Sequence, residues 1–209
     1  KGVSTKIISK GLNELKLVLR SLSKNLNTAL FLVSFFFYIA GVMTVISMAS
    51  VFGIEELNFE TTELIQLIIL LQLIGALGAW LFSRISNASG NKISLVLIIL
   101  IWTSVCIASY FVASKGQFYI IAATVGLVMG GVQSMSRSTY SKLIPSDEGN
   151  TASYFSFYDV LEKTASSVGL FSFGMMSDYY GSMRQSILAL ITFFMIGLIL
   201  LLFVKIGKD

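Results

Sequence analysis

Long uncharged apolar intervals alternate with short charged or glycine-containing segments along most of this sequence. The hydrocarbon core of a bilayer takes about 20 apolar residues of a helix, so the intervals between ionisable residues measure the candidate spans. Five intervals reach this length, and they are Lys24–Glu55, Glu63–Arg84, Lys92–Lys115, Lys115–Arg137 and Arg184–Lys205. The pattern therefore predicts five transmembrane helices.

A sixth span is less clear, because the interval from Lys163 to Asp178 is too short to cross a bilayer alone. A crossing helix in this part of the chain has to begin near Asn150 and to carry Asp159, Glu162 and Lys163 inside the membrane. The alternative is a re-entrant or interfacial segment, which leaves five spans and places the two termini on opposite sides. The distribution of basic residues decides between these two topologies.

Basic residues fall in alternate loops if the chain has six spans. With the N-terminus inside, the outer loops carry only Lys115 and Arg184 as cations, together with several acidic residues. The inner cations are Lys1, Lys6, Lys10, Lys16, Arg20, Lys24, Arg84, Lys92, Arg137, Lys142, Lys205 and Lys208. Cytoplasmic loops of membrane proteins carry such an excess of Lys and Arg. We therefore predict six spans, at about residues 26–53, 63–83, 93–114, 117–143, 150–177 and 184–205, with both termini in the cytoplasm.

The composition agrees with a polytopic membrane protein and excludes several kinds of chemistry. Of 209 residues, 55% are hydrophobic and 12% are charged, whereas soluble domains carry about 25% charged residues. The chain has no histidine and one cysteine, Cys106, which excludes an intrachain disulfide, a Cys/His zinc site and Ser-His-Asp catalysis. We expect no metal, no cofactor and no nucleic-acid partner. Because the chain begins with Lys1 and lacks a signal-peptide pattern, we interpret it as a piece of a longer protein.

Residues 1–25 have a different pattern from the spans. Apolar residues step by three and four positions, which is typical of one face of a helix, while basic residues form a stripe beside them. The apolar face contains Ile8, Leu12, Leu15, Leu19 and Leu22, and the basic stripe contains Lys16, Arg20 and Lys24. We predict an amphipathic basic connector that lies on the cytoplasmic membrane surface and contacts anionic headgroups.

Charged residues inside the predicted fifth span are the strongest indication of function. Ser156, Asp159 and Lys163 share one helical stripe, and Glu162 lies beside it. A charged residue near the middle of a membrane helix costs about 2.5–3.5 kcal/mol, so three of them must be paired or hydrated in a cavity. Ionisable groups in such positions mark solute or proton pathways; the alternative is a salt bridge that locks helices or a gate.

A loose internal repeat is typical of a transporter. The second predicted span is followed by Gly90–Lys92, and the fifth by Gly174–Arg184, so each set of three spans has a glycine-and-basic turn after its middle helix. Sets of three spans lie in opposite orientations in the membrane, as in the inverted repeats of secondary transporters. The third and sixth spans are almost uniformly apolar, and we expect them to face lipid.

Three segments resemble a known transporter family. They are Phe36–Val42, Gly130–Ser138 with the sequence GGVQSMSRS, and Ser153–Lys163 with the sequence SYFSFYDVLEK. From about Gly11 to Val204, the chain is similar to the C-terminal half of a major facilitator superfamily (MFS) transporter. It most resembles the group called the unknown major facilitator family, which is related to the vacuole effluxer proteins of fungal autophagy, and the segments are closest to bacterial members.

The resemblance implies an all-α fold of six transmembrane helices in two inverted three-helix repeats, which is half of an MFS fold. The partners that it implies are the lipid bilayer, a preceding six-helix half that this chain lacks, and a small solute; the implied location is the inner membrane of a bacterium. The first, second, fourth and fifth spans line the solute path in that fold. Two departures are Ile39, Ala40 and Met43 in place of polar residues in the first span, and Ser83 in place of an acidic residue before Arg84.

We therefore predict part of a secondary active transporter that moves a small solute, such as an amino acid or another carboxylate, by alternating access with coupling to protons. Arg137 and Lys163 are candidates to hold an anionic group, and Asp159 or Glu162 to carry the proton. The candidate site residues are Tyr38, Gln133, Arg137, Tyr158, Asp159, Glu162 and Lys163. The alternative function is a non-transporting membrane scaffold or sensor.

An intramembrane enzyme does not fit the sequence. Aspartyl protease chemistry needs two carboxylates that share a proton. The only candidate partner for Asp159 is Asp178, which lies about 28 Å away along the same helix at 1.5 Å per residue. The spacing therefore excludes this class of enzyme.

Overall fold

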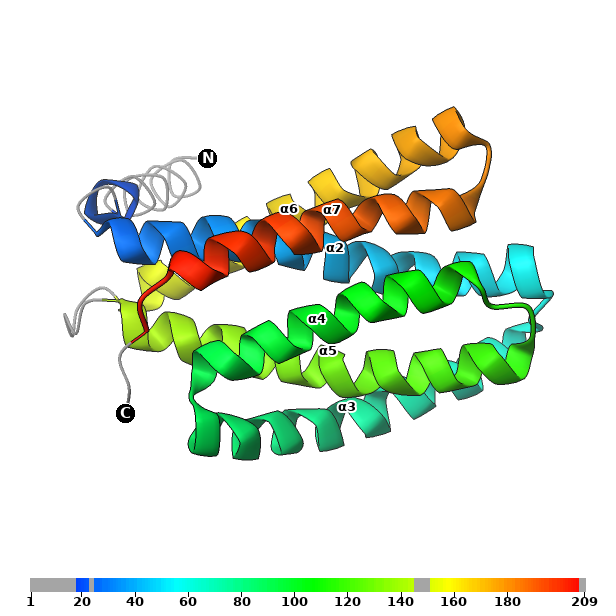
Figure 1. Cartoon of the computed structure of the whole chain (residues 1–209), viewed down its shortest axis with the longest axis horizontal. Helices are drawn as coiled ribbons and strands as arrows, with labels where there is room; N and C mark the ends of the chain where they lie inside the picture. Colours follow the sequence, from blue (N-terminus) through cyan, green and yellow to red (C-terminus); the bar gives the residue numbers. More distant parts are fainter. Residues whose placement is uncertain (1–17, 23–24, 145–150, 207–209) are drawn as a thin grey trace, which may run out of the picture.

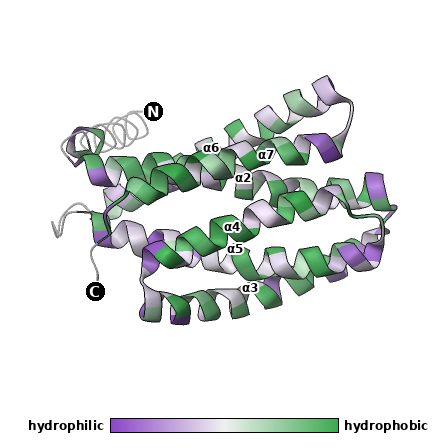
Figure 2. Ribbon diagram, viewed as in Figure 1, coloured by the Kyte–Doolittle hydropathy of each residue, from purple (hydrophilic) through white to green (hydrophobic). Residues whose placement is uncertain are grey.

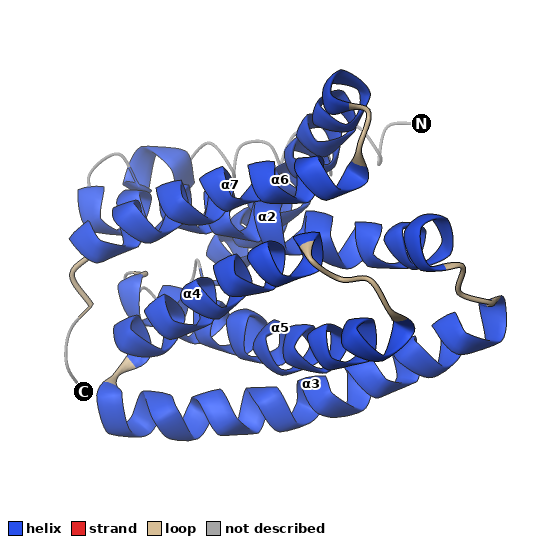
Figure 3. Ribbon diagram, turned by 45° about the vertical axis from the view of Figure 1, so that its right-hand side comes forward, coloured by secondary structure: helices blue, strands red, loops and turns tan. Residues whose placement is uncertain are grey.

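Long helices joined by short turns make up the structure (Figure 1), a computed structural model that describes residues 18–22, 25–144 and 151–206. The main helices are α2 (Leu26–Leu57), α3 (Thr61–Ser89), α4 (Asn91–Tyr110), α5 (Lys115–Leu143), α6 (Thr151–Tyr180) and α7 (Met183–Phe203). Figure 3 shows only helices and loops in the described part of the chain. Five helices, α2 to α5 and α7, are long and apolar enough to cross a membrane. The predicted all-α polytopic membrane fold is confirmed.

The charged segment forms one continuous helix, α6, of 30 residues. At 1.5 Å per residue this helix is about 45 Å long, which exceeds the roughly 30 Å of a bilayer core. It lies beside α2 and α7 and runs from one end of the bundle to the other (Figure 1). Its charged residues keep it out of the group of five apolar helices, but its length and continuity favour a full crossing over a re-entrant segment.

The helix packing has the symmetry of two inverted repeats. The closely packed pairs include α3 with α5, α2 with α6, α2 with α7, α4 with α5, and α4 with α7. An exchange of α2 with α5, α3 with α6 and α4 with α7 turns the α3–α5 pair into the α2–α6 pair and the α2–α7 pair into the α4–α5 pair. It leaves the α4–α7 pair unchanged. Because each set contains three helices, the two sets run in opposite directions, as the sequence repeat predicted.

The turns between the second and third helix of each set share a backbone feature. Gly90, between α3 and α4, has φ +86°, and Gly181, between α6 and α7, has φ +62°. Positive φ angles favour glycine because it lacks a Cβ atom. The two glycines are 91 positions apart, so the glycine-and-basic turns that the sequence repeat indicated are equivalent in the structure.

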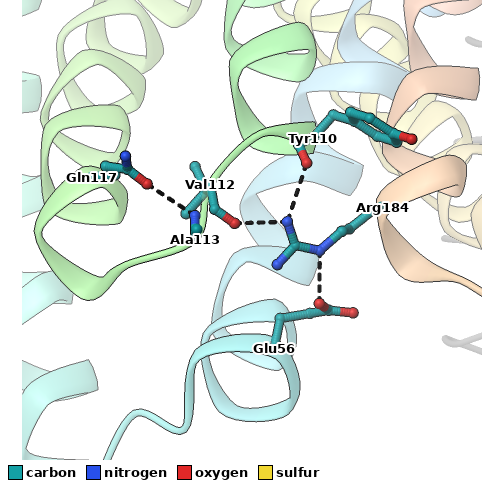
Figure 4. Close-up of polar contacts among 6 residues, drawn as sticks. All are labelled: Glu56, Tyr110, Val112, Ala113, Gln117 and Arg184. Atoms are coloured by element: carbon teal, nitrogen blue, oxygen red, sulfur yellow. Dashed lines mark hydrogen bonds and ion pairs between the residues drawn. The ribbon is translucent and has the colours of Figure 1, made fainter.

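A basic residue at the second position of α4 or α7 binds the end of the other helix. The Arg184 guanidinium of α7 donates to the carbonyl oxygens of Tyr110 (3.1 Å) and Val112 (2.6 Å) and forms an ion pair with Glu56 of α2 (2.8 Å), as Figure 4 shows. At the opposite end, Lys92 donates to the carbonyl oxygens of Leu202 (2.7 Å) and Val204 (2.8 Å). Arg184 lies 92 positions after Lys92, and the acceptors Leu202 and Val204 lie 92 positions after Tyr110 and Val112. These reciprocal contacts satisfy helix-end carbonyl groups that have no partner within their own helix.

The apolar helices α4 and α7 face both protein and lipid. Trp102 and Phe194 are fully buried and stack on each other, with ring centroids 6.1 Å apart. On the outward faces of the same helices, Leu100, Ile107 and Ile199 are exposed. The predicted lipid contact thus accounts for one face only, and helix packing accounts for the other. Figure 2 shows hydrophobic residues along the helices and hydrophilic residues mostly towards their ends.

Both described ends of the chain lie at the same end of the bundle. The Asn27 side chain donates to the Lys205 carbonyl oxygen (2.6 Å) and accepts from the Lys205 amide (2.8 Å). Of the predicted connector, residues 18–22 are helical, Val18 and Leu22 are buried, and the Tyr154 hydroxyl of α6 donates to Ser21 (2.7 Å). The rest of the connector, including the predicted basic positions 16 and 24, lies outside the described residues.

Candidate functional site: a charged face on α5 and α6

The charged residues of α6 remain on the surface of the bundle. Asp159 and Lys163 are exposed and Glu162 is half-buried, although all three lie well inside a helix long enough to cross a bilayer. No membrane lipid can solvate an exposed charge at this depth. The face that carries these residues must therefore meet water, a solute or another polar surface.

An ion pair joins this face to α5. The Arg137 guanidinium donates to Asp159 Oδ1 at 2.6 Å, and both side chains are about half exposed, at 52% each. Among the described helices, α5 and α6 are not a closely packed pair along their backbones, so their side chains bridge the space between them. The sequence analysis named Arg137 as a candidate to hold an anionic group, and in the structure it binds Asp159.

Stacked aromatic rings lie beneath the ion pair. The Arg137 guanidinium lies 5.4 Å from the ring centroid of Tyr158, which is a cation–π contact. The Tyr158 ring stacks on Phe35 of α2 (4.2 Å) and Tyr140 of α5 (5.2 Å). This cluster connects α2, α5 and α6 near the end of the bundle where both described ends of the chain lie. It packs beneath the charged face.

Tyr38 and Tyr158, two of the predicted site residues, lie below this face. Tyr38 is fully buried and Tyr158 is 2% exposed. The Tyr38 hydroxyl is 2.8 Å from the Ser136 hydroxyl of α5, and either group can donate the hydrogen bond. In this conformation both tyrosines hold helices together and neither is open to a solute.

Three predicted site residues have no polar partner in the described part of the chain. The side chains of Gln133 on α5 and of Glu162 and Lys163 on α6 form no hydrogen bond or ion pair with any described residue. The pairing of Lys163 with Asp159 that the helical spacing suggested is not formed, because Asp159 binds Arg137 instead. Within the described part of the chain, the face therefore offers the Lys163 ammonium and the Glu162 carboxylate without an ion-pair partner, beside the Arg137–Asp159 pair.

A polar network next to this face was not anticipated from the sequence. Asn91, at the start of α4, accepts a short hydrogen bond from Ser86 of α3. Its side-chain amide donates to Ser138 (3.1 Å) and Thr139 (3.2 Å) of α5. Because Ser138 directly follows Arg137, this network fixes the α3–α4 turn against the part of α5 that carries the ion pair. The only sequence signal for it was the position of Asn91 after Gly90.

No group of three or more His, Cys, Asp or Glu side chains with the arrangement of a metal site occurs within residues 18–22, 25–144 and 151–206. The charged face carries two cations, Arg137 and Lys163, and two carboxylates, Asp159 and Glu162. Such a face can bind a small charged molecule.

Comparisons with known proteins agree with the fold and the sequence pattern. A family model described as "Vacuole effluxer Atg22 like" matches residues 2–209. The uncharacterized MFS-type transporter YxiO of Bacillus subtilis (strain 168) is 31% identical over 175 residues, which cover 84% of this chain and 40% of that protein. Autophagy-related protein 22 of Vanderwaltozyma polyspora is 30% identical over 194 residues, which cover 86% of this chain and 35% of that protein. The chain thus spans less than half the length of these relatives.

Among solved structures, a variant of the E. coli fucose:proton symporter FucP has a similar fold. The TM-score is 0.73 at 16% sequence identity, and the match covers 90% of this chain and 45% of the symporter chain. At this identity the likeness concerns the fold alone.

Proposed function

Because the chain belongs to the vacuole effluxer Atg22-like family, we propose that it forms one half of a secondary transporter that moves a small solute by alternating access. The match over residues 2–209 confirms the predicted relation to vacuole effluxers, and the relatives and the symporter fold confirm the predicted MFS half. The prediction that the chain is not an enzyme is confirmed as well, since these proteins are named as transporters or effluxers.

A second six-helix half is the partner that completes this proposal. The chain covers 45% of the symporter chain to which its fold is similar, and α3 is the least buried of the five apolar helices. The large exposed side chains of α3 are Ile65, Ile68, Ile69, Leu73, Leu77, Trp80 and Leu81. We propose that part of this face packs against the second half and that the solute path runs between the two halves.

The observation that carries the proposal is the charged face of α5 and α6. Structural ion pairs in membranes are usually closed, because an unpaired charge in hydrocarbon is costly. Here Lys163 and Glu162 have no polar partner among the described residues and lie beside the Arg137–Asp159 pair. A water-filled solute path supplies the solvation that these two groups need.

The chemistry of the face favours a solute with a carboxylate, such as an amino acid. Lys163 and Arg137 bind the carboxylate, and protonation of Asp159 weakens its hold on Arg137 so that the guanidinium can turn to the solute. Glu162 is the alternative proton carrier, and Lys163 then alternates between an acidic partner and the solute. Proton coupling is the hypothesis to test first, because two carboxylates, Asp159 and Glu162, lie on this face.

Transport by the native full-length protein in proteoliposomes tests this function. We expect a proton gradient to drive accumulation of at least one probe from a panel of radiolabelled alanine, lysine, glutamate and pyruvate. Lys163→Ala should abolish uptake, whereas Lys205→Ala, whose side chain lies at the bundle end, should not. Asp159→Asn or Glu162→Gln should remove gradient-driven accumulation and spare exchange of internal for external probe.

Two results contradict the proposal. Unchanged uptake in Lys163→Ala, Asp159→Asn and Glu162→Gln would mean that the charged face contributes only to helix packing and has no role in transport. No flux of any probe by a well-folded full-length protein would favour the non-transporting scaffold or sensor.

We also propose that the protein lies in a bacterial inner membrane with both termini of this segment in the cytoplasm. In a Cys106→Ala background, Ser182→Cys at the α6–α7 turn should react with an impermeant maleimide added to intact cells. Ser89→Cys at the α3–α4 turn should react only after the cells are opened. The reverse pattern of labelling means that the orientation is inverted.

A further inference from the structure

The middle helices of the two repeats, α3 and α6, can be aligned residue by residue. Three of the four buried residues of α3 have a buried counterpart in α6 at a constant separation of 91 positions, which is also the separation of the turn glycines that follow the two helices. The matching buried pairs are Leu67 with Tyr158, Gly78 with Gly169, and Phe82 with Phe173. The alignment therefore has buried positions along much of both helices.

The two aligned glycines make equivalent contacts. A Cβ atom on Gly78 would collide with the backbone of Leu127 on α5, and a Cβ atom on Gly169 would collide with the backbone of Ala40 on α2. Since α5 and α2 are the first helices of their repeats, α3 packs on α5 as α6 packs on α2. The rotation of the two helices about their axes is thus the same in the two repeats.

This alignment places Gln72 of α3 at the position of Lys163 of α6, because both lie six residues before the aligned glycine. Asp159, one turn before Lys163, contacts Arg137 of α5, so the exposed Asp159–Lys163 stripe lies on the charged face of the bundle. By the symmetry of the repeats, the stripe of α3 that contains Gln72 faces the same side.

Gln72 also lies near the depth of the charged face. It precedes the middle of α3 by about 4 Å, and Lys163 precedes the middle of α6 by about 4 Å, at 1.5 Å per residue. Because α3 and α6 run in opposite directions, the two side chains lie on opposite sides of the midplane. Solute sites of inverted-repeat transporters lie near this midplane.

The Gln72 side chain is exposed and hydrogen bonds to no described residue. A primary amide in hydrocarbon leaves two donors and an acceptor unsatisfied, which costs several kcal/mol. It needs water, a solute or a polar partner. Symmetry and polarity together thus single out this residue on an otherwise apolar part of α3.

We infer that Gln72 lines the solute path on the outer side of the midplane, as the counterpart of Lys163 on the inner side. This inference rests on the proposed transport function, since it requires a water-filled path between two halves. Gln72 is a neutral hydrogen-bonding contact for the polar group of a solute that Lys163 and Arg137 hold by charge.

Cysteine accessibility in the native full-length protein tests the inference without knowledge of the solute. In a Cys106→Ala background, Gln72→Cys, Lys163→Cys and Leu100→Cys are each treated with a small anionic methanethiosulfonate reagent in membrane vesicles. Leu100 is the control, because it lies at mid-depth on the outward face of α4. Ala76→Cys, one turn along the same stripe of α3, is a second reporter if Gln72→Cys folds poorly.

We expect Gln72→Cys and Ala76→Cys to react at least tenfold faster than Leu100→Cys, at a rate similar to that of Lys163→Cys. If Lys163→Cys reacts while both α3 variants are as slow as Leu100→Cys, the inference about Gln72 is wrong and the proposed path is unaffected. If Lys163→Cys is also as slow as Leu100→Cys, no water reaches the charged face and the proposed function fails with the inference.

Discussion

The helices α3 and α6 occupy equivalent places in the two repeats but differ in the side chains that they leave exposed or half-buried. Their glycines, turns and buried positions correspond at one constant spacing. Where α6 carries Asp159 and Glu162, however, α3 carries Ile68 and Leu71. The shared positions are those that pack against a neighbouring helix, and the differing positions are those left exposed.

This difference separates the residues that build the fold from those that give it a function. A position that fills the same contact in both repeats is explained by packing alone. A charge that occurs in only one repeat has no such explanation and costs about 2.5–3.5 kcal/mol near the middle of a membrane helix. The charged face of α6 is thus the part of this chain that packing does not account for.

The largest effect is expected where the repeats agree most closely, at the aligned glycines. Gly78→Leu places a side chain against the backbone of α5 and must separate α3 from α5. We expect a loss of about 3 kcal/mol, the upper end of what overpacking usually costs, and Gly169→Leu should be destabilised in the same way. Gly174→Leu is the matched control, because a Cβ atom there has nothing within 4 Å.

Unfolding of the purified variants in mixed micelles, followed by helical circular dichroism, measures these losses. A stable Gly78→Leu variant would mean that α3 does not pack on α5 as closely as described, and the alignment of the two repeats would lose its main contact.

A smaller effect is expected at the reciprocal contacts of α4 and α7. Arg184 contacts two carbonyl oxygens and Glu56, whereas Lys92 contacts two carbonyl oxygens only. Hydrogen bonds from charged donors contribute about 1.5–3 kcal/mol. Both side chains are partly exposed, which weakens these bonds. We therefore expect Arg184→Met to cost about 2 kcal/mol and Lys92→Met about 1 kcal/mol in the same unfolding assay. Equal losses would show that the ion pair with Glu56 adds nothing.

The ion pair that distinguishes α6 from α3 should contribute less to stability than these contacts. Arg137 and Asp159 are both about half exposed, and exposed pairs contribute about 0–1 kcal/mol. A double-mutant cycle with Arg137→Gln and Asp159→Asn should therefore give a coupling energy below about 1 kcal/mol. A coupling well above 2 kcal/mol would identify a structural lock, and the case for a transport role would weaken.

Much of the fold could be predicted from the sequence, because bilayer thickness and charge bias constrain helices strongly. The uncharged intervals located five of the long helices, and the position of Asp159, Glu162 and Lys163 identified the sixth as different. The helices α2 and α3 exceed their predicted spans by several residues, as at Ser89 of α3, since helices continue past the hydrocarbon core, whereas α4 and α7 end a few residues before theirs. Intervals between charges cannot reveal such extensions.

The arrangement of the candidate site was harder to predict. Helical spacing placed Asp159 near Lys163, but it could not show that Asp159 forms its ion pair with Arg137 of another helix. The same limitation applies to Tyr38 and Tyr158, whose burial depends on how α2 packs against α5 and α6. The periodicity of one helix predicts which side chains are neighbours on that helix. Contacts between helices depend on how each helix is rotated about its axis and on the depth of each residue in the membrane. The roles of all seven candidate residues remain predictions.

The smallest effect is expected where the two repeats meet, at Trp102 and Phe194. These aligned residues, 92 positions apart, stack on each other, and the indole nitrogen of Trp102 is buried without a hydrogen-bond partner among the described residues. Trp102→Phe removes that unsatisfied donor, which favours the variant by about 1–3 kcal/mol, but it also loses ring volume in a close-packed core, which costs a similar amount. We therefore expect a change within about 1 kcal/mol in the micelle assay. A loss above 2 kcal/mol in Trp102→Phe would show that the indole donor has a partner, such as a bound water or lipid, and that the two repeats differ at their contact as well as on their exposed faces.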